Sequence, residues 1–291
     1  MRGGARSEEL GARRCGLSRR LFIGGIVGAG ALRLGADPLG MAIGCQTYPV
    51  RDALAKDVDG TLRQLAAFGY RAIEMCSPAG YANSGYGPLT KFTAAELKGK
   101  IHAAGMACES CHFQWRELKE SLNERIAFAR ELGLRQMVVS TFGLRNDAPM
   151  AEWMSAADEL NRVGEPVAQA GLQLGFHNHN FEFREIDGVL VYDKLMERLD
   201  PKLVKMQFQV SVISLGYEAA KFMRKYPGRF VSLHLQDWSA SEKKQVPVGA
   251  GVVDWKDLFA AAKAGGVRNY FVELSMDALK PSYEYLHGLR A

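Results

Sequence analysis

The chain has 291 residues, of which 47% are hydrophobic, and it carries a formal net charge of +5. Seven of its arginines lie in the first forty residues, so the remainder holds 30 basic and 29 acidic side chains and is close to neutral. Such a body lacks the concentrated basic face that nucleic-acid binding needs, and its length suits one α/β domain with a full core.

The N-terminal segment is typical of a twin-arginine export signal: Ser18-Arg19-Arg20-Leu21-Phe22-Ile23 precedes a Gly/Ala-rich apolar run. Arg33 interrupts this run before it reaches the roughly 20 residues that cross a bilayer. We therefore predict a signal peptide and linker over residues 1–40, cleavage near Ala29-Gly30-Ala31, and an exported, periplasmic protein without a membrane span after processing. An uncleaved N-terminus, disordered or anchoring, is the alternative.

From residue 41 onward, short apolar runs alternate with longer amphipathic stretches, which is the pattern of parallel βα units. The predicted strands cover residues 42–46, 72–76, 107–112, 137–141, 173–177, 204–208, 230–234 and 270–273. The predicted helices cover residues 61–68, 93–104, 118–132, 150–170, 192–199, 217–225 and 255–264, and five of them end in a glycine stop, at Gly69, Gly105, Gly133, Gly171 and Gly265. Eight units favour a closed (β/α)8 TIM barrel over residues 41–291, with an open doubly wound sheet as the alternative.

The longest stretch without a periodic pattern is residues 77–92, after the second predicted strand. In a barrel, a loop at this position overhangs the mouth, and loops of this length are usually functional or disordered. We expect it to form a flap over the substrate.

The body contains four cysteines: Cys45, Cys76, Cys108 and Cys111. Cys108 and Cys111 have the C-x-x-C spacing of redox and zinc pairs. Residues three apart on a strand point to opposite faces, however, so we expect all four to be reduced core residues.

Polar residues gather where the predicted strands end, the place that supplies catalytic side chains in such barrels. They are Glu74, His112, His177, His179, Glu182, Gln207, Gln209, His234, Gln236, Asp237 and Glu273. A buried carboxylate without a partner costs several kcal/mol, so Glu273 must have one. We predict that Glu74, His112, His179, Asp237 and Trp238 contact a substrate. His177 is equally compatible with a core histidine.

Several stretches, taken in order, resemble the sugar phosphate isomerase/epimerase family of xylose-isomerase-like barrels. They are residues 72–74, 175–183, 206–209, 228–237, 248–255 and 272–273. The resemblance implies one divalent ion, Mn²⁺ first, with Mg²⁺, Co²⁺ or Zn²⁺ also typical. It implies Glu182, Gln209, His234 and Glu273 as the metal ligands, with Glu182 and Glu273 as the catalytic proton carriers.

The sequence departs from this family at three positions. Gln209 stands where the family has Asp, Gln236 where Lys is common, and Ala250 where an acidic residue is usual. An amide oxygen can coordinate an ion but contributes no charge, so ion binding should be weaker. A non-catalytic carbohydrate-binding barrel that has lost its metal is therefore the alternative function.

The leading hypothesis is a metal-dependent isomerase or epimerase, or a related lyase, that acts on a sugar through an ene-diolate. Export favours an unphosphorylated carbohydrate, free or glycosidic, including 3-keto-sugars made by a separate sugar oxidoreductase. If the enzyme is a lyase, a keto-glycoside is the expected substrate. A homo-oligomer is compatible with the sequence. An endonuclease IV type of DNA-repair enzyme is disfavoured, because the charge balance does not suit DNA and a three-metal site needs more ligands.

Overall fold

The computed structural model describes residues 37–289 of the chain. The predicted twin-arginine motif and its cleavage site lie outside the described residues. No helix within 37–289 is long and apolar enough to span a membrane.

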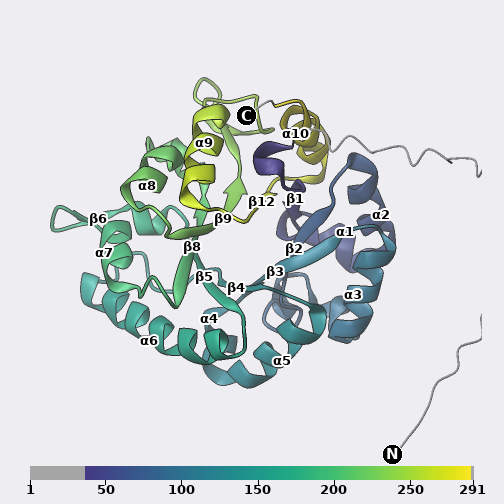
Figure 1. The fold of residues 1–291 in the computed structure, drawn as a ribbon, viewed down its shortest axis with the longest axis horizontal. Coiled ribbons are helices and arrows are strands. Elements are labelled where there is room, and N and C mark those ends of the chain that lie inside the picture. Colours follow the sequence, from purple (N-terminus) through teal and green to yellow (C-terminus); the bar gives the residue numbers. More distant parts are fainter. Residues whose placement is uncertain (1–36, 290–291) are drawn as a thin grey trace, which may run out of the picture. The chain divides into compact units, whose positions relative to one another are not determined.

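Eight parallel strands close into a barrel, in the order β1-β12-β9-β8-β5-β4-β3-β2, which confirms the predicted TIM barrel (Figure 1). The predicted strand positions agree with the observed ones to within about two residues. The strands are β1 (Gly44–Gln46), β2 (Ala72–Cys76), β3 (Ala107–Phe113), β4 (Gln136–Val139), β5 (Gln173–His177), β8 (Val204–Gln209), β9 (Phe230–Leu235) and β12 (Asn269–Val272).

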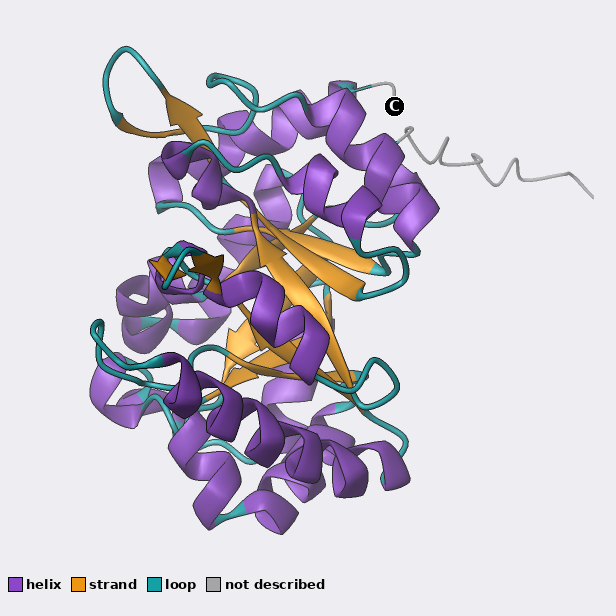
Figure 2. Ribbon diagram, turned by 90° about the vertical axis from the view of Figure 1, so that its left-hand side faces the viewer, coloured by secondary structure: helices purple, strands orange, loops and turns teal. Residues whose placement is uncertain are grey.

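Helices surround these strands on the outside, as Figure 2 shows. They are α1 (Arg51–Lys56), α2 (Val58–Phe68), α3 (Ala94–Ala103), α4 (Trp115–Glu120), α5 (Leu122–Leu132), α6 (Met150–Gln169), α7 (Val191–Arg198), α8 (Ala219–Lys225), α9 (Trp255–Gly265) and α10 (Met276–Gly288). The helix predicted over residues 118–132 is two helices, because Ser121 has non-helical dihedral angles of φ −142° and ψ 37°. Helices α1 and α10 were not predicted from the sequence.

Two of the predicted glycine stops show why glycine is needed there. Gly69 and Gly133 follow α2 and α5 with φ of 114° and 93°, a left-handed conformation that disfavours other residues. Helix α9 ends one residue later than predicted, because Gly266, with φ 76°, takes this conformation and Gly265 still belongs to the helix.

Two short antiparallel hairpins extend from the C-terminal ends of barrel strands. One pairs β6 (Glu185–Ile186) with β7 (Val189–Leu190), and the other pairs β10 (Asp237–Ser239) with β11 (Lys244–Val246). The β10–β11 hairpin follows β9 almost directly, so it stands at the end of the barrel where the polar strand ends meet.

The loop over residues 77–92 is packed onto the barrel by two buried tyrosines. The Tyr86 hydroxyl lies 2.8 Å from Thr47 Oγ1, after β1, and the Tyr81 hydroxyl donates to Ser140 Oγ, after β4, at 2.6 Å. These bonds fix the loop across the mouth of the barrel.

The four cysteines of the described body are buried free thiols, as expected. Burial raises the pKa of Cys108 to about 12, so this thiol is protonated at neutral pH. Redox chemistry at the C-x-x-C pair is correspondingly disfavoured.

Candidate active site

The floor of the site is a network of polar side chains that point into the barrel from neighbouring strands. Glu74 lies at its centre, without exposed surface. Its carboxylate accepts hydrogen bonds from Gln46 Nε2 at 2.7 Å, Gln207 Nε2 at 2.8 Å and Ser110 Oγ at 2.5 Å. It also lies 2.5 Å from His234 Nε2. Parallel register explains the convergence, because Glu74 is paired with Gln46 on one side and with Ser110 on the other.

Electrostatics hold Glu74 in its ionised form. Burial alone would raise its pKa, but attraction to His112 and His234, with hydrogen bonds from His234 and Ser110, lowers the pKa to about 2. Its oxygens are occupied below the cavities, so Glu74 holds His234 in place instead of reaching a substrate as predicted.

His234 lies between two carboxylates. Its Nε2 faces Glu74, and its Nδ1 lies 3.2 Å from Glu273 Oε2. Burial alone would lower the pKa of His234, but attraction to Glu273 and Glu74 and the hydrogen bonds to both raise it to about 9. The ring is therefore an imidazolium at neutral pH, and it is the partner that the buried Glu273 requires.

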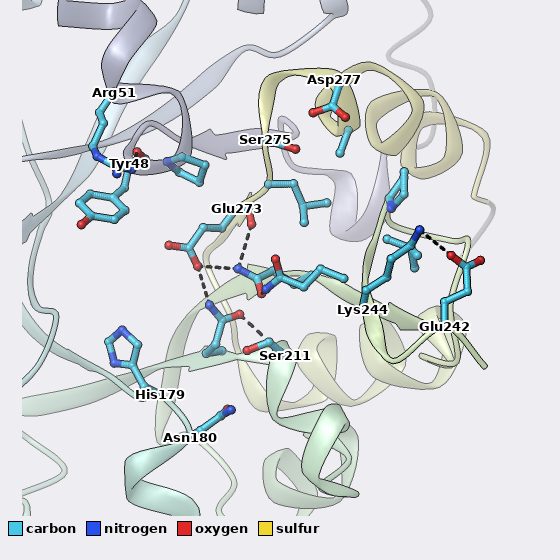
Figure 3. A pocket seen from close by; sticks show the side chains of 18 of the residues that line it. Tyr48, Arg51, His179, Asn180, Ser211, Glu242, Lys244, Glu273, Ser275 and Asp277 are labelled. Atoms are coloured by element: carbon cyan, nitrogen blue, oxygen red, sulfur yellow. Dashed lines mark hydrogen bonds and ion pairs between the residues drawn. The ribbon is translucent and has the colours of Figure 1, made fainter. Parts of the chain in front are cut away.

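Glu273 follows β12 and keeps 15% of its side chain exposed. Its Oε2 also receives hydrogen bonds from Gln209 Nε2 at 2.5 Å and from Gln236 Nε2 at 3.0 Å. Burial would raise the pKa of Glu273, but attraction to His234 and its hydrogen bond outweigh burial and lower the pKa. No donor among residues 37–289 is bonded to the other oxygen, Oε1. In Figure 3 that oxygen points to the side where Tyr48 and His179 lie.

Three of the four residues predicted as metal ligands are thus together: Gln209, His234 and Glu273. The structure does not bring Glu182 into this group by any hydrogen bond. Its Oε2 accepts the His179 backbone N–H at 2.7 Å, closing a short 3-10 turn, and its Oε1 has no partner among the described residues. Burial raises the pKa of Glu182 to about 7.

A second set of nitrogen donors lies beside the first. Ligand atoms of His112, His177 and His234, all buried, lie within 4.8 Å of one another. Donors at about 2.0–2.2 Å from one ion would be about 3–4 Å apart, so small side-chain shifts would suffice. Burial lowers the pKa of both His112 and His177, which leaves them neutral, and His177 Nδ1 has no hydrogen-bond partner in the described chain. This donor set fits a divalent ion.

Asp237 and Trp238 were predicted to contact substrate, and the structure places them elsewhere. The Asp237 carboxylate is buried and accepts hydrogen bonds from five donors in the segment that follows it: the backbone N–H groups of Trp238, Gly249, Gly251 and Val253 and the Trp255 indole N–H. Asp237 therefore shapes the loop after the β10–β11 hairpin. Trp238 lines neither of the two large cavities at the barrel mouth.

Those two cavities meet above Glu273. One, of about 680 Å³, has His112 and His177 in its lining, and we call it the histidine cavity. The other, of about 940 Å³, is lined by Gln236, Lys244 and Gln245 of the hairpin region, and we call it the hairpin cavity. His179, predicted as a substrate contact, lines both, and burial lowers its pKa to about 4.

Several residues of the site were not predicted from the sequence. Gln46 and Ser110 bind Glu74 from the first and third strands, and Tyr48 lines both cavities. Gln46 closes the first strand and could have been found by the same strand-end rule. Ser110 and Tyr48 carry no signal, because a serine within a strand and a tyrosine after one are common.

The chain is similar to several known proteins in sequence and in fold. A family model for the xylose isomerase-like TIM barrel matches residues 62–289. An inosose dehydratase from Geobacillus thermodenitrificans is 26% identical over 230 residues, which span 65% of this chain and 76% of that protein.

Among solved structures, a sugar phosphate isomerase/epimerase from Parabacteroides distasonis superposes with a TM-score of 0.71 at 23% identity, covering 84% of this chain and 93% of that one. A xylose isomerase-like TIM barrel protein from Mycobacterium smegmatis, in complex with magnesium, gives a TM-score of 0.63 at 14% identity over 84% of this chain and 95% of that one. At these identities the two structures support the shared fold.

Proposed function

The chain belongs to the xylose isomerase-like TIM barrel family, and we propose that it removes the proton next to the carbonyl group of an unphosphorylated sugar or keto-sugar. The base is Glu273. The observation that carries this proposal is the asymmetry of its carboxylate: three donors bond Oε2, and Oε1 is left facing the cavities. The carboxylate is ionised at neutral pH, so it can accept a proton there.

The side chains around Glu273 fix the orientation of its carboxylate. His234 is held from below by Glu74, while Gln209 and Gln236 hold Oε2 from the side. A base whose orientation is already fixed by neighbouring side chains loses little conformational entropy when a substrate binds. The loop over residues 77–92 covers one side of the site, which limits the access of water.

One divalent ion, held by His234 with the oxygens of Gln209 and Glu273 or with His112 and His177, would supply polarisation of the substrate carbonyl. Oxygen donors favour Mn²⁺ or Mg²⁺, and three imidazoles favour Zn²⁺ or Co²⁺. Metal analysis of the purified protein therefore distinguishes the two donor sets. We keep Mn²⁺ as the first expectation.

An uncharged substrate is supported by the pairing of three of the four Lys and Arg residues that line the cavities. Arg116, Lys119 and Lys244 each have a carboxylate partner, whereas Arg51 donates to the Tyr48 carbonyl and lies over the Tyr48 ring. Lys244 is paired with Glu242 at 2.5 Å, and Arg116 with Glu120 at 2.9 Å. A phosphate site usually has unpaired Arg or Lys donors. This pairing also agrees with the proposed export to the periplasm.

Among the outcomes of proton removal, elimination fits the site best. Epimerisation needs a second proton carrier on the opposite face of the ring, and Glu182 is fully buried and lines neither cavity. Elimination and aldose–ketose isomerisation can use one carboxylate. That a relative is an inosose dehydratase supports elimination.

The test is solvent exchange. A panel of keto-sugars is incubated in D₂O, and loss of the proton next to the carbonyl is followed by NMR. The Glu273→Gln variant should lose exchange by at least about 10³-fold while keeping its fold, since the amide cannot take up the proton. Glu109→Gln, a surface change at the start of β3, should exchange like the unmodified protein.

If Glu273→Gln exchanges at the unmodified rate, the base is another group. If the unmodified protein binds sugars but exchanges none of them, the carbohydrate-binding alternative is favoured. That alternative draws support from Gln209, whose amide already occupies the Glu273 carboxylate.

A further inference from the structure

The cleft at the barrel mouth has two parts that share one junction. Three residues line both the histidine cavity and the hairpin cavity: Tyr48, His179 and Glu273. In Figure 3 Tyr48 and His179 lie on one side of Glu273, and Lys244 and Glu242 lie on the other. The proposed base is therefore at the boundary of the two cavities and not at the end of one.

Each cavity is large enough for a ligand of its own. Their volumes, about 680 Å³ and about 940 Å³, both fall within the roughly 300–1,000 Å³ of an ordinary small-molecule site. A single sugar ring would leave most of the cleft filled with water.

The linings of the two cavities differ in chemistry. The histidine cavity has aromatic walls, where Trp115 and Phe142 pack edge to face with ring centroids 5.6 Å apart, above the imidazoles of the floor. Aromatic faces suit the C–H faces of a sugar ring, and the histidines suit its oxygens. This part fits the reacting ring.

Among the described residues, the hairpin cavity has no aromatic pair of this kind, and its lining combines amide and charged side chains with apolar ones such as Pro247 and Leu274. Gln245 donates to Gln236, and Asp277 adds a carboxylate from the first turn of α10. Such groups match the hydroxyls of a second, unreacting unit.

We propose that the substrate is a two-unit carbohydrate, a glycoside of a keto-sugar, whose ketone ring occupies the histidine cavity and whose second unit occupies the hairpin cavity. The linking bond then lies over Glu273. This inference rests on the proposed function and deepens it.

The chemistry at the junction is a balanced elimination. Glu273 takes the proton from the carbon next to the ketone, and the electron pair of that C–H bond forms a double bond to the adjacent linking carbon. The bond from this carbon to the glycosidic oxygen breaks, and its electron pair leaves with the oxygen. Glu273 passes the proton to that oxygen, so the products are an unsaturated keto-sugar and a free alcohol on the second unit.

The test compares 3-ketoglucose with the 3-keto derivatives of trehalose, sucrose, maltose and cellobiose. For at least one of the four glycosides, kcat/KM should exceed that for 3-ketoglucose by about tenfold or more. The Asp277→Trp variant, which narrows the hairpin cavity, should lower kcat/KM for that glycoside at least tenfold more than it lowers exchange on 3-ketoglucose. Glu284→Trp, an exposed position two turns further along α10, is the matched control and should change neither.

Exchange on 3-ketoglucose without preference for any glycoside would overturn the two-unit inference and leave the proposed function standing. An equal loss on both substrate types in Asp277→Trp would overturn it as well. If the Asp277→Trp variant does not fold, the ratio of kcat/KM for the glycosides to that for 3-ketoglucose in the unmodified protein tests the two-unit inference alone. If none of the five compounds reacts, both the proposed function and the two-unit inference are overturned.

Discussion

Glu182 gives the sharpest test of how the site is built. The resemblance to the family makes it a metal ligand and proton carrier, whereas the structure shows a buried carboxyl that closes a turn through the His179 N–H. We expect the Glu182→Gln variant to keep its metal content and its activity, because the amide oxygen can still accept that hydrogen bond.

The magnitude follows from burial. The pKa of Glu182 is raised from its ordinary 4.5 to about 7 by loss of solvation, and its hydrogen bond to the His179 N–H only partly opposes this. The folded protein therefore holds this proton more tightly than the unfolded chain does. The resulting stabilisation is complete below about pH 4.5 and is lost as the pH rises through 7, which amounts to about 3 kcal/mol at about 1.4 kcal/mol per pH unit. Glutamine cannot ionise, so the stability of the variant does not fall in this way as the pH rises.

The assay is urea unfolding of metal-free protein between pH 5 and pH 8.5, in parallel for both proteins. Their stabilities should be similar at pH 5, and the variant should be more stable by about 3 kcal/mol at pH 8.5, or roughly 10 °C in Tm. Equal pH profiles would refute the burial argument. A variant that loses both its ion and its activity would restore Glu182 as a ligand.

Three further predictions concern the floor of the barrel. Glu74→Ala should destabilise the protein by about 3–5 kcal/mol in urea unfolding, because it leaves the His234 imidazolium without its lower partner, and a loss below 1 kcal/mol would contradict the network. Gln209→Asp should raise the affinity for Mn²⁺ at least tenfold, as measured by calorimetry. The same change should lower the Tm of the metal-free protein, since a second carboxylate then faces Glu273. An unchanged affinity would exclude position 209 as a ligand. Metal binding should displace the proton of His234, whose pKa is about 9. The affinity for the ion should therefore rise about tenfold per pH unit between pH 7 and 9. An affinity that does not change with pH would exclude His234 as a metal ligand.

Much of the barrel could be predicted because its signals are local. Each strand is a short apolar run, and helices with clear caps follow, such as α3, where Thr93 and Glu96 form a reciprocal capping box. Helix α1 escaped prediction because its six residues are too few for a periodic pattern. Helix α10 carries Pro281 in its interior, which reads as a break.

The strand-end rule also found most of the site, since parallel strands bring their C-terminal ends together whatever lies between them. Gln209, His234 and Glu273 are all among the residues that it selected, and hydrogen bonds join them in the structure. It could not assign roles, because those depend on which way each side chain turns after its strand ends. Glu182 and Asp237 both follow strands closely, yet both bond to the backbone of their own loops.

The amides of the floor explain why this network can persist without help from an ion. Glu74, His234 and Glu273 together carry two negative charges and one positive charge, and the remaining partners, Gln209 and Gln236 among them, are neutral donors. An aspartate at position 209, as the family resemblance leads one to expect, would put a second carboxylate beside Glu273 and would need a cation to balance it. With glutamine there, the same contact is a hydrogen bond that orients the proposed base. The departure that should weaken the expected metal site therefore also fixes the Glu273 carboxylate through Oε2, and Oε1 keeps no bonded donor among the described residues.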